Sequence, residues 1–340
     1  MNKAFLQAIS YYFPEQSLSN EKLSEMHPEW SVEKISTKTG IYNRYQSATD
    51  ETAGDMAVKA AGKLIEEYHI DKNEIDFVML CTQSPDYFLP TTACIIQDKL
   101  GLNKNCGALD FNLGCSGFIY GLGLAKGLVV SDQATNVLFI TSETYTKHIH
   151  PLDKSNKTIF GDGAAACLIS SDNKTDFWNA EIMKFTYATD GSGFENLIIK
   201  NGAMRNRVFG NAKDVIEENV FVRNDDYLFM DGKAIFDFTA FEVPKIFNEN
   251  LQKNSLKIDD VDLFIFHQAN AYMLNFIRNR CKIPEDKFYI DIKDGGNTVS
   301  STIPIALKRA SEKSLIKKNN KLLLCGFGVG LSMGAVVINF

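Results

Sequence analysis

Three polar residues stand at positions from which they could carry out acyl-transfer chemistry. Cys115 lies between two glycines, directly after an apolar run and before a helix-like segment. His267 follows a second apolar run, and Asn297 lies in a glycine-rich turn in front of another helix-like segment. A thiol at a helix N-terminus is favoured as the thiolate, which attacks thioesters readily. Neutral imidazole and amide N–H groups can hold the oxygen of an enolate.

Each of these residues, taken alone, also fits a purely structural role. Free cysteine is among the most buried residue types, a lone histidine is more often structural than catalytic, and an asparagine before a helix is commonly a cap or turn residue. The choice between structure and catalysis therefore depends on whether the fold brings Cys115, His267 and Asn297 together.

The surrounding chain alternates amphipathic helices with short apolar runs. Helical spacing extends over 51–69, and further helices are expected at 92–100, 116–130 and 233–253. The apolar runs 75–81, 136–140 and 261–266 are typical of strands that are buried on both faces. This alternation predicts an α/β protein.

An internal repeat indicates how these elements are arranged. The pattern Ile75–Leu80 recurs as Val261–Phe266, and Val137–Ile140 recurs as Leu322–Cys325 at nearly the same spacing. The same shift carries Cys115 onto the segment that begins at Asn297. We therefore expect two similar halves, 1–171 with the nucleophile and 172–340 with the histidine and asparagine, whose site residues lie at equivalent strand ends.

Composition excludes several other functions. The net charge of −6 gives no global reason for nucleic-acid binding, and no apolar run is long enough to span a membrane. The seven cysteines include no C-x-x-C pair, and His148 and His150 lack supporting ligands, so we expect no metal site. The absence of a signal-peptide pattern and of a disulfide framework favours a cytoplasmic location.

These residues resemble the thiolase-fold condensing enzymes, and most closely β-ketoacyl-acyl-carrier-protein synthase III. The likeness covers nearly the whole chain, and its motifs are Thr39-Gly-Ile41, Pro90-x-x-Ala-Cys94-x-x-Gln97, Cys115-Ser-Gly-Phe118, Phe160-Gly-Asp-Gly163, His267-Gln-Ala-Asn270, Gly295-Gly-Asn-Thr298 and the C-terminal Gly-x-Gly loop.

The resemblance implies a homodimer of duplicated, five-layered α-β-α-β-α subunits with a Cys115–His267–Asn297 triad. The backbone N–H groups of Cys115 and Val329 would form the oxyanion hole. Leu89 would reach the acyl pocket of the partner subunit. No cofactor is implied, because coenzyme A and phosphopantetheine thioesters are substrates; an acyl carrier protein is the expected partner and acyl-coenzyme A a further donor.

The substrate entrance departs from the family. The family's tryptophan and arginine that enclose the adenine of coenzyme A fall on Lys34 and Lys38, so stacking on one side is expected to be lost. Lys154 keeps a positive charge near that site. We also expect Asn270 and Phe327 to contact the substrate.

The carrier-docking positions depart as well. An arginine and a lysine that dock the carrier in the family fall on Met273 and Asp237, while Arg280 keeps a charge. Docking would then use Arg280 and Arg278, or other basic residues such as Arg205 and Arg207. These changes favour a specialised relative over the housekeeping enzyme of fatty-acid initiation.

The resemblance and the residues together predict a decarboxylating condensation. An acyl primer held on Cys115 would be joined to a malonyl thioester, giving a β-ketoacyl thioester. One alternative is transfer of the acyl group to an oxygen or nitrogen nucleophile, which Asn297 argues against. A non-catalytic partner subunit would be expected to lack Cys115. A nucleotide-binding module would need a strand-G-x-G-x-x-G-helix segment, which the sequence lacks.

Overall fold

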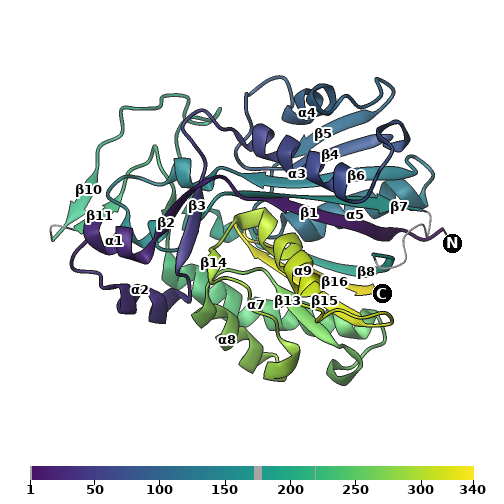
Figure 1. The fold of residues 1–340 in the computed structure, drawn as a ribbon. Coiled ribbons are helices and arrows are strands. Elements are labelled where there is room, and N and C mark those ends of the chain that lie inside the picture. The colour runs from purple at the N-terminus through teal and green to yellow at the C-terminus, as the bar shows by residue number, and fades with distance from the viewer. Residues whose placement is uncertain (1, 172–177, 219) are drawn as a thin grey trace.

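The computed structural model describes residues 2–171, 178–218 and 220–340, and in these residues the main sheet has nine strands (Figure 1). Their order is β5 (Gly107–Phe111), β4 (Phe77–Cys81), β6 (Asn136–Glu143), β7 (Gly163–Ser170), β1 (Phe5–Tyr12), β8 (Ala180–Thr189), β16 (Ser332–Asn339), β15 (Lys321–Gly328) and β13 (Leu263–Phe266). The strands β1 and β8 join through the pairs Phe5–Glu181 and Leu6–Ala180. The sheet therefore has two halves, here called ladders. The first ladder runs from β5 to β1 and the second from β8 to β13, and these two pairs join them.

The predicted repeat is present in the strand pairing of the two ladders. In the first ladder β4 is parallel to β6, β6 is antiparallel to β7, and β7 is antiparallel to β1. In the second, β13 is parallel to β15, β15 is antiparallel to β16, and β16 is antiparallel to β8. The expected boundary at 171/172 falls in the connection between β7 and β8, at the edge of the described residues.

Helices cover the outer faces of the ladders and fill the space between them. The outer face of the first ladder carries α3 (Ala53–Glu67) and α4 (Thr92–Leu100), and that of the second carries α7 (Gly232–Lys253) and α8 (Ala271–Arg280). Between the ladders lie α5 (Gly117–Val130) and α9 (Thr302–Glu312).

Neighbouring residues of one strand face different layers. In β4, Met79 packs into the central layer and Leu80 packs against the outer helices. In β13, Ile265 and Phe264 divide in the same way. Because side chains alternate along a strand, a continuous apolar run is what a strand covered on both faces requires. The expected α/β class with α-β-α-β-α layering is confirmed.

The helix boundaries follow from local capping. Thr52 and Asp55 form a capping box at the start of α3, and the Asp231 side chain accepts from the N–H groups of Lys233 and Ala234 at the start of α7. By contrast, no side chain of the N-cap residue caps α5 or α9. The two central helices therefore keep N–H groups at their N-termini for other partners.

Smaller elements gather at one end of the ladders. They are β2 (Gln16–Ser19), β3 (Asn43–Gln46), β14 (Asp294–Gly295), β9 (Leu197–Ile198), β12 (Phe229–Met230), β10 (Val215–Glu217), β11 (Val220–Arg223), α1 (Asn20–Met26), α2 (Val32–Thr39) and α6 (Lys154–Lys157). The short 3₁₀ helices are η1 (Lys72–Glu74), η2 (Tyr145–His148), η3 (Gly191–Asn196), η4 (Ile258–Asp260), η5 (Glu285–Lys287) and η6 (Val299–Ser301). The segment 144–158 contains η2 and α6.

Candidate active site

Cys115 lies between the end of β5 and the start of α5, at the base of a cavity of about 420 Å³. The backbone N–H groups of Val329 and of Cys115 itself bond the sulfur. The chain passes very close at Gly328, where an added Cβ would lie 2.8 Å from the Cys115 Sγ. A glycine is therefore required for the C-terminal loop to bring the Val329 N–H to the sulfur.

The Cys115 sulfur is held as a thiol in this environment. Burial raises the pKa of Cys115 to about 12, and the negative charge of the nearby Glu143 acts in the same direction. Hydrogen bonds from the Val329 and Cys115 N–H groups oppose this shift because they favour the thiolate. The same two donors would also favour an oxyanion on an acyl group attached to this sulfur.

His267 directly follows β13 and is 2% exposed. Its backbone N–H donates to the carbonyl of Cys325 on the neighbouring strand β15 (2.8 Å), which places the ring at the strand ends. The Nδ1 atom lies 2.7 Å from Thr302 Oγ1, and the ring packs edge-to-face on Phe327 with centroids 5.6 Å apart. Burial lowers the pKa of His267 to about 3, so the imidazole is neutral at physiological pH.

Both backbone polar groups of Asn297 are hydrogen-bonded. Its N–H donates to the Ile159 carbonyl, and its own carbonyl accepts from Gly161, each at 3.0 Å. The side-chain Oδ1 accepts from the N–H of Val299 at 2.9 Å. The side-chain donors are both on Nδ2, so this is the atom that can donate to a substrate.

The fold brings the three predicted residues to one place. Cys115, His267 and Asn297 all line the same cavity, together with Phe327 and Asn270. They come from the loop before α5, from the end of β13 and from the turn before α9, which are the positions that the internal repeat pointed to.

A fully buried carboxyl group lies behind this cavity, and sequence reasoning missed it. Glu143, at the end of β6, accepts from the Ser300 hydroxyl at 3.0 Å, from the Ser84 hydroxyl at 3.3 Å and from the Gln83 N–H at 3.1 Å. Burial raises the pKa of Glu143 to about 8. The only local signal was an acid at the end of an apolar strand. Through these hydrogen bonds Glu143 connects the residues that follow β4 with η6, the short helix after Asn297.

The Trp30 ring lines the cavity, whereas the resemblance places the family's tryptophan at Lys34. Trp30 and Lys38 line the cavity, and the ammonium groups of Lys34 and Lys38 lie 5.4 and 5.8 Å from the Trp30 ring centroid. The positions expected to enclose the adenine are lysines, as predicted from the sequence, but an aromatic ring stands beside them, on Trp30 just before α2. Lys34 and Lys38, one turn apart on α2, both reach this ring from the same face of the helix. Lys154 forms an ion pair with Glu29 next to this group.

Of the two other residues predicted to contact the substrate, Asn270 lines the cavity and Leu89 does not. Asn270 caps α8 by accepting from the Met273 N–H at 2.8 Å. Leu89 is exposed and does not line the cavity of its own chain.

The positions predicted to dock the carrier are partly engaged within the chain. Arg278 is paired with Glu285 at 3.6 Å, and the Arg280 guanidinium lies over the Phe241 ring at 5.6 Å. Met273 lines the cavity, and Asp237 is paired with Lys233 at 2.7 Å.

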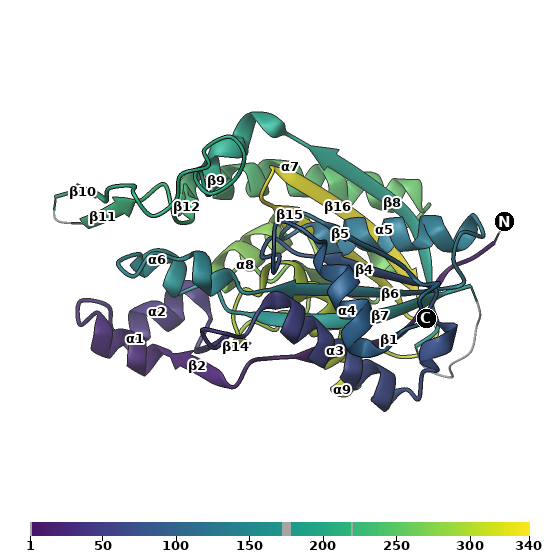
Figure 2. The same cartoon turned by 90° about the horizontal axis from the view of Figure 1, so that it is seen from above.

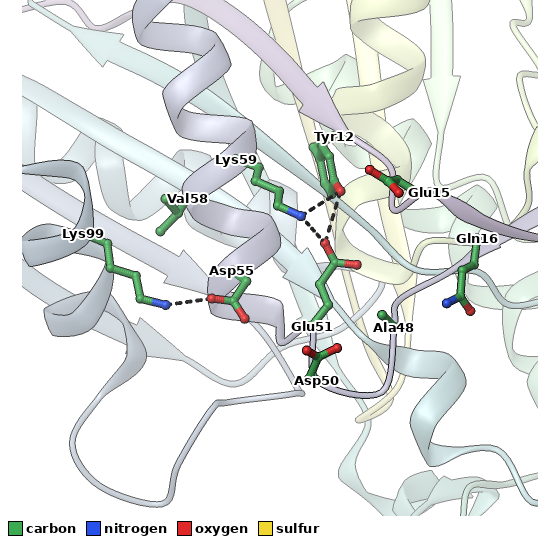
Figure 3. Close-up of a pocket in the computed structure, with 10 residues that line it drawn as sticks. All are labelled: Tyr12, Glu15, Gln16, Ala48, Asp50, Glu51, Asp55, Val58, Lys59 and Lys99. Carbon is green, nitrogen blue, oxygen red and sulfur yellow. Dashed lines mark hydrogen bonds and ion pairs between the residues drawn. The ribbon is translucent and has the colours of Figure 1, made fainter.

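A second hollow, of about 480 Å³, lies around Tyr12 and α3, and Figure 3 shows the side chains that line it. Its cations are already matched: Lys59 bonds Glu51 at 2.6 Å and Lys99 bonds Asp55 at 2.7 Å. None of its lining residues is a cysteine or histidine. Although its volume is slightly larger, it lacks a nucleophile, so the cavity at Cys115 is the candidate active site.

Residues 2–171, 178–218 and 220–340 contain no group of three or more His, Cys, Asp or Glu side chains placed to hold a metal ion. Among the helices in these ranges, none is long and apolar enough to cross a membrane.

Comparison with known proteins gives one consistent result. Family models described as 3-oxoacyl-[acyl-carrier-protein (ACP)] synthase III and its C-terminal part match residues 109–191 and 251–340. A Clostridium perfringens protein named beta-ketoacyl-[acyl-carrier-protein] synthase III is 37% identical over 99% of both chains.

Solved structures agree with these sequence matches. A crystal structure of a 3-oxoacyl-(acyl-carrier-protein) synthase III is 42% identical, covers 99% of this chain and 100% of its own, and has a TM-score of 0.95. The priming beta-ketosynthase from the R1128 polyketide biosynthetic pathway is 26% identical over 100% of this chain and 96% of its own, with a TM-score of 0.85.

Proposed function

Since this chain belongs to the 3-oxoacyl-[acyl-carrier-protein] synthase III family, we propose that it joins an acyl primer to a malonyl thioester by decarboxylating condensation. The observation that carries the proposal is that Cys115, His267 and Asn297 line one cavity. The product is a β-ketoacyl thioester, which places the enzyme, a transferase, in fatty-acid or related lipid synthesis.

In the first half-reaction the primer moves onto Cys115. The sulfur attacks the thioester carbonyl, and the oxyanion that forms accepts from the N–H groups of Cys115 and Val329. The carbon–sulfur bond of the incoming thioester then breaks, and its thiol leaves with the proton that Cys115 has given up. The uncapped N-terminus of α5 stabilises the developing negative charge on the sulfur.

In the second half-reaction a malonyl thioester enters the same cavity. Its carbon–carbon bond to the carboxylate breaks, CO₂ leaves, and the electron pair becomes an enolate whose oxygen accepts from His267 and Asn297. The enolate carbon attacks the acyl carbon on Cys115. The carbon–sulfur bond breaks, and the Cys115 thiolate recovers a proton.

The alternative of acyl transfer to an oxygen or nitrogen nucleophile is not favoured. It requires no enolate stabilisation, whereas the Asn297 side chain is fixed so that Nδ2 is free to donate. A non-catalytic subunit is likewise not favoured, because Cys115 is present and bonded by two backbone donors.

Three finer features complete the proposal. Substrates arrive as thioesters of an acyl carrier protein or of coenzyme A, and the chemistry needs no metal or other cofactor. The enzyme works in the cytoplasm. It acts as a homodimer in which the exposed apolar segment Tyr87-Phe88-Leu89 meets a second copy, so that Leu89 reaches the partner's acyl pocket.

The test is intact-protein mass spectrometry after incubation with a panel of acyl thioesters. We expect a mass gain equal to one acyl group, abolished in Cys115→Ala. Addition of a malonyl thioester should then remove the adduct and release CO₂. If no member of the panel leaves an adduct on the wild-type protein, the acyl-enzyme proposal is wrong.

A further inference from the structure

A stretch of unpaired positive charge lies beside the cavity mouth. Residues 200–213, here called the basic loop, read Lys-Asn-Gly-Ala-Met-Arg-Asn-Arg-Val-Phe-Gly-Asn-Ala-Lys and contain four cations and no acid. The whole chain, by contrast, has a net charge of −6. Asp226, which the loop backbone bonds, and Asp214, which follows the loop, offset part of this charge. The exposed side chains of Arg205, Arg207 and Lys213 still present cations to solvent, which suits an acidic partner.

The basic loop is held in a defined shape by its neighbours. The Asp226 carboxylate accepts from the N–H groups of Gly210 and Ala212, each at 3.0 Å, and from the Asn201 side chain at 2.9 Å. The Gly202 N–H donates to the Asn206 carbonyl at 2.8 Å. The loop therefore presents its side chains from an ordered backbone.

The side chains of the basic loop face solvent. Met204 is 78% exposed, Val208 63% and Phe209 61%, and the neighbouring Arg205 and Arg207 are exposed as well. Apolar side chains interleaved with cations are typical of a protein-binding surface rather than of a solvated loop.

Three of the five cations on α7 and α8 are engaged in ion pairs, unlike those of the basic loop. On α7, Lys233 pairs with Asp237 and Lys245 with Glu242, each at 2.7 Å, and near α8 Arg278 pairs with Glu285 at 3.6 Å. Within the described residues, none of the four basic-loop cations forms an ion pair. The α7–α8 face, where the family docks its carrier, thus offers less free positive charge than the basic loop.

The base of the basic loop forms part of the cavity wall. The loop is in the connection between β9 and β12, which pair with each other, and Leu197 of β9 and Met230 of β12 line the cavity with Cys115. In Figure 2 the hairpin β10–β11 in the same connection lies at the end of the molecule that also carries α1, α2 and α6. A protein bound here would stand next to the entrance through which a thioester reaches Cys115.

We propose that the basic loop is the docking surface for the acidic face of the carrier protein that delivers the malonyl thioester. The proposal rests on the condensing function proposed above. Arg205, Arg207 and Lys213 supply the charge, and Met204 and Phe209 supply apolar contact. An anionic membrane would match the same charges, but it delivers no thioester to the cavity.

The test is steady-state kinetics of Arg205→Gln/Arg207→Gln/Lys213→Gln with two malonyl donors, malonyl-carrier protein and malonyl-pantetheine. We expect the KM for the carrier substrate to rise about tenfold or more with kcat unchanged, and its salt dependence to flatten. Kinetics with malonyl-pantetheine should stay at wild-type values, which shows that the variant is folded and competent. The matched control is Lys233→Gln/Lys245→Gln/Lys253→Gln, which removes three cations from α7.

Several results would overturn the proposal. A carrier KM within about twofold of wild type, an equal rise for malonyl-pantetheine, or an equal rise in the α7 control would each do so. So would loop-dependent binding to phosphatidylglycerol vesicles with an unchanged carrier KM. If the wild-type protein condenses neither donor, the proposed function fails; direct binding of fluorescently labelled malonyl-carrier protein to wild type and variant then still tests the docking surface.

Discussion

The Nδ1 atom of His267 and the hydroxyl of Thr302 lie 2.7 Å apart in a fully enclosed contact, and the same hydroxyl lies 3.1 Å from the Val299 carbonyl. A hydroxyl has one proton, so it can donate to only one of these two acceptors. If it donates to Nδ1, the proton of the neutral ring is on Nε2. That tautomer is the one that can donate to an enolate oxygen in the cavity.

Replacing Thr302 by valine keeps the shape of the side chain and removes this hydroxyl. We expect CO₂ release from a malonyl thioester to fall about 10- to 100-fold, because the ring loses the hydroxyl that contacts Nδ1 and holds it in place. Acylation of Cys115, followed by mass spectrometry, should remain near the wild-type rate. Thr302→Ser, which keeps the hydroxyl, should retain most of the decarboxylation; wild-type CO₂ release in the valine variant would contradict the role.

Asn297→Ala should separate the two half-reactions. The variant loses the Nδ2 donor but leaves the Cys115 environment unchanged, so it should still form the acyl adduct. Release of CO₂ from a malonyl thioester should drop by about 100-fold or more. A radiolabelled malonyl substrate measures this step directly. Normal decarboxylation in Asn297→Ala would show that the amide is not the enolate donor.

Gly328→Ala should impair acylation of Cys115. The added Cβ would lie 2.6 Å from the Cys115 Cβ and 2.8 Å from its sulfur, so the C-terminal loop or the nucleophile must shift. A displacement of about 1 Å from the reactive geometry lowers a reaction rate about 100-fold. The rate of adduct formation on Cys115 in a single turnover measures this loss.

Gly127→Ala is the matched control for that substitution. Gly127 lies inside α5, and an added Cβ there would meet no atom within 4 Å. We expect this variant to keep full activity and to gain about 0.5–1 kcal/mol in the free energy of unfolding, since alanine is the better helix former. Loss of activity in Gly127→Ala would mean that the Gly328 effect is not specific to the sulfur.

The buried Glu143 carboxyl should make stability depend on pH. Its pKa is raised by burial from 4.5 to about 8, so between these values the folded state binds more protons than the unfolded state. Stability contributed by this group is therefore full below pH 4.5 and is lost as the pH rises toward 8. Relative to Glu143→Gln, the wild-type melting temperature should fall between pH 5 and pH 8, as measured by calorimetry. Parallel curves for the two proteins would contradict the raised pKa.

The order of strands and helices and the positions of the three central site residues could be predicted from local sequence patterns. Apolar runs identify strands such as β4 and β13, because a strand covered on both faces needs apolar side chains in both alternating positions. The repeat and the glycine-flanked or strand-terminal positions of Cys115, His267 and Asn297 are readable because each depends on residues only a few places away.

Tertiary structure decided what each of these residues meets. Glu143 bonds Ser300, which is 157 residues away in the chain, and Val329 approaches Cys115 only because the C-terminal strand lies beside α5. Whether a surface cation is paired can be decided in the same way: Lys3 pairs with Glu181, which is 178 residues away in the chain, whereas Arg205 has no ion-pair partner among the described residues. Such pairings follow from the packing of distant segments, which local sequence patterns do not encode.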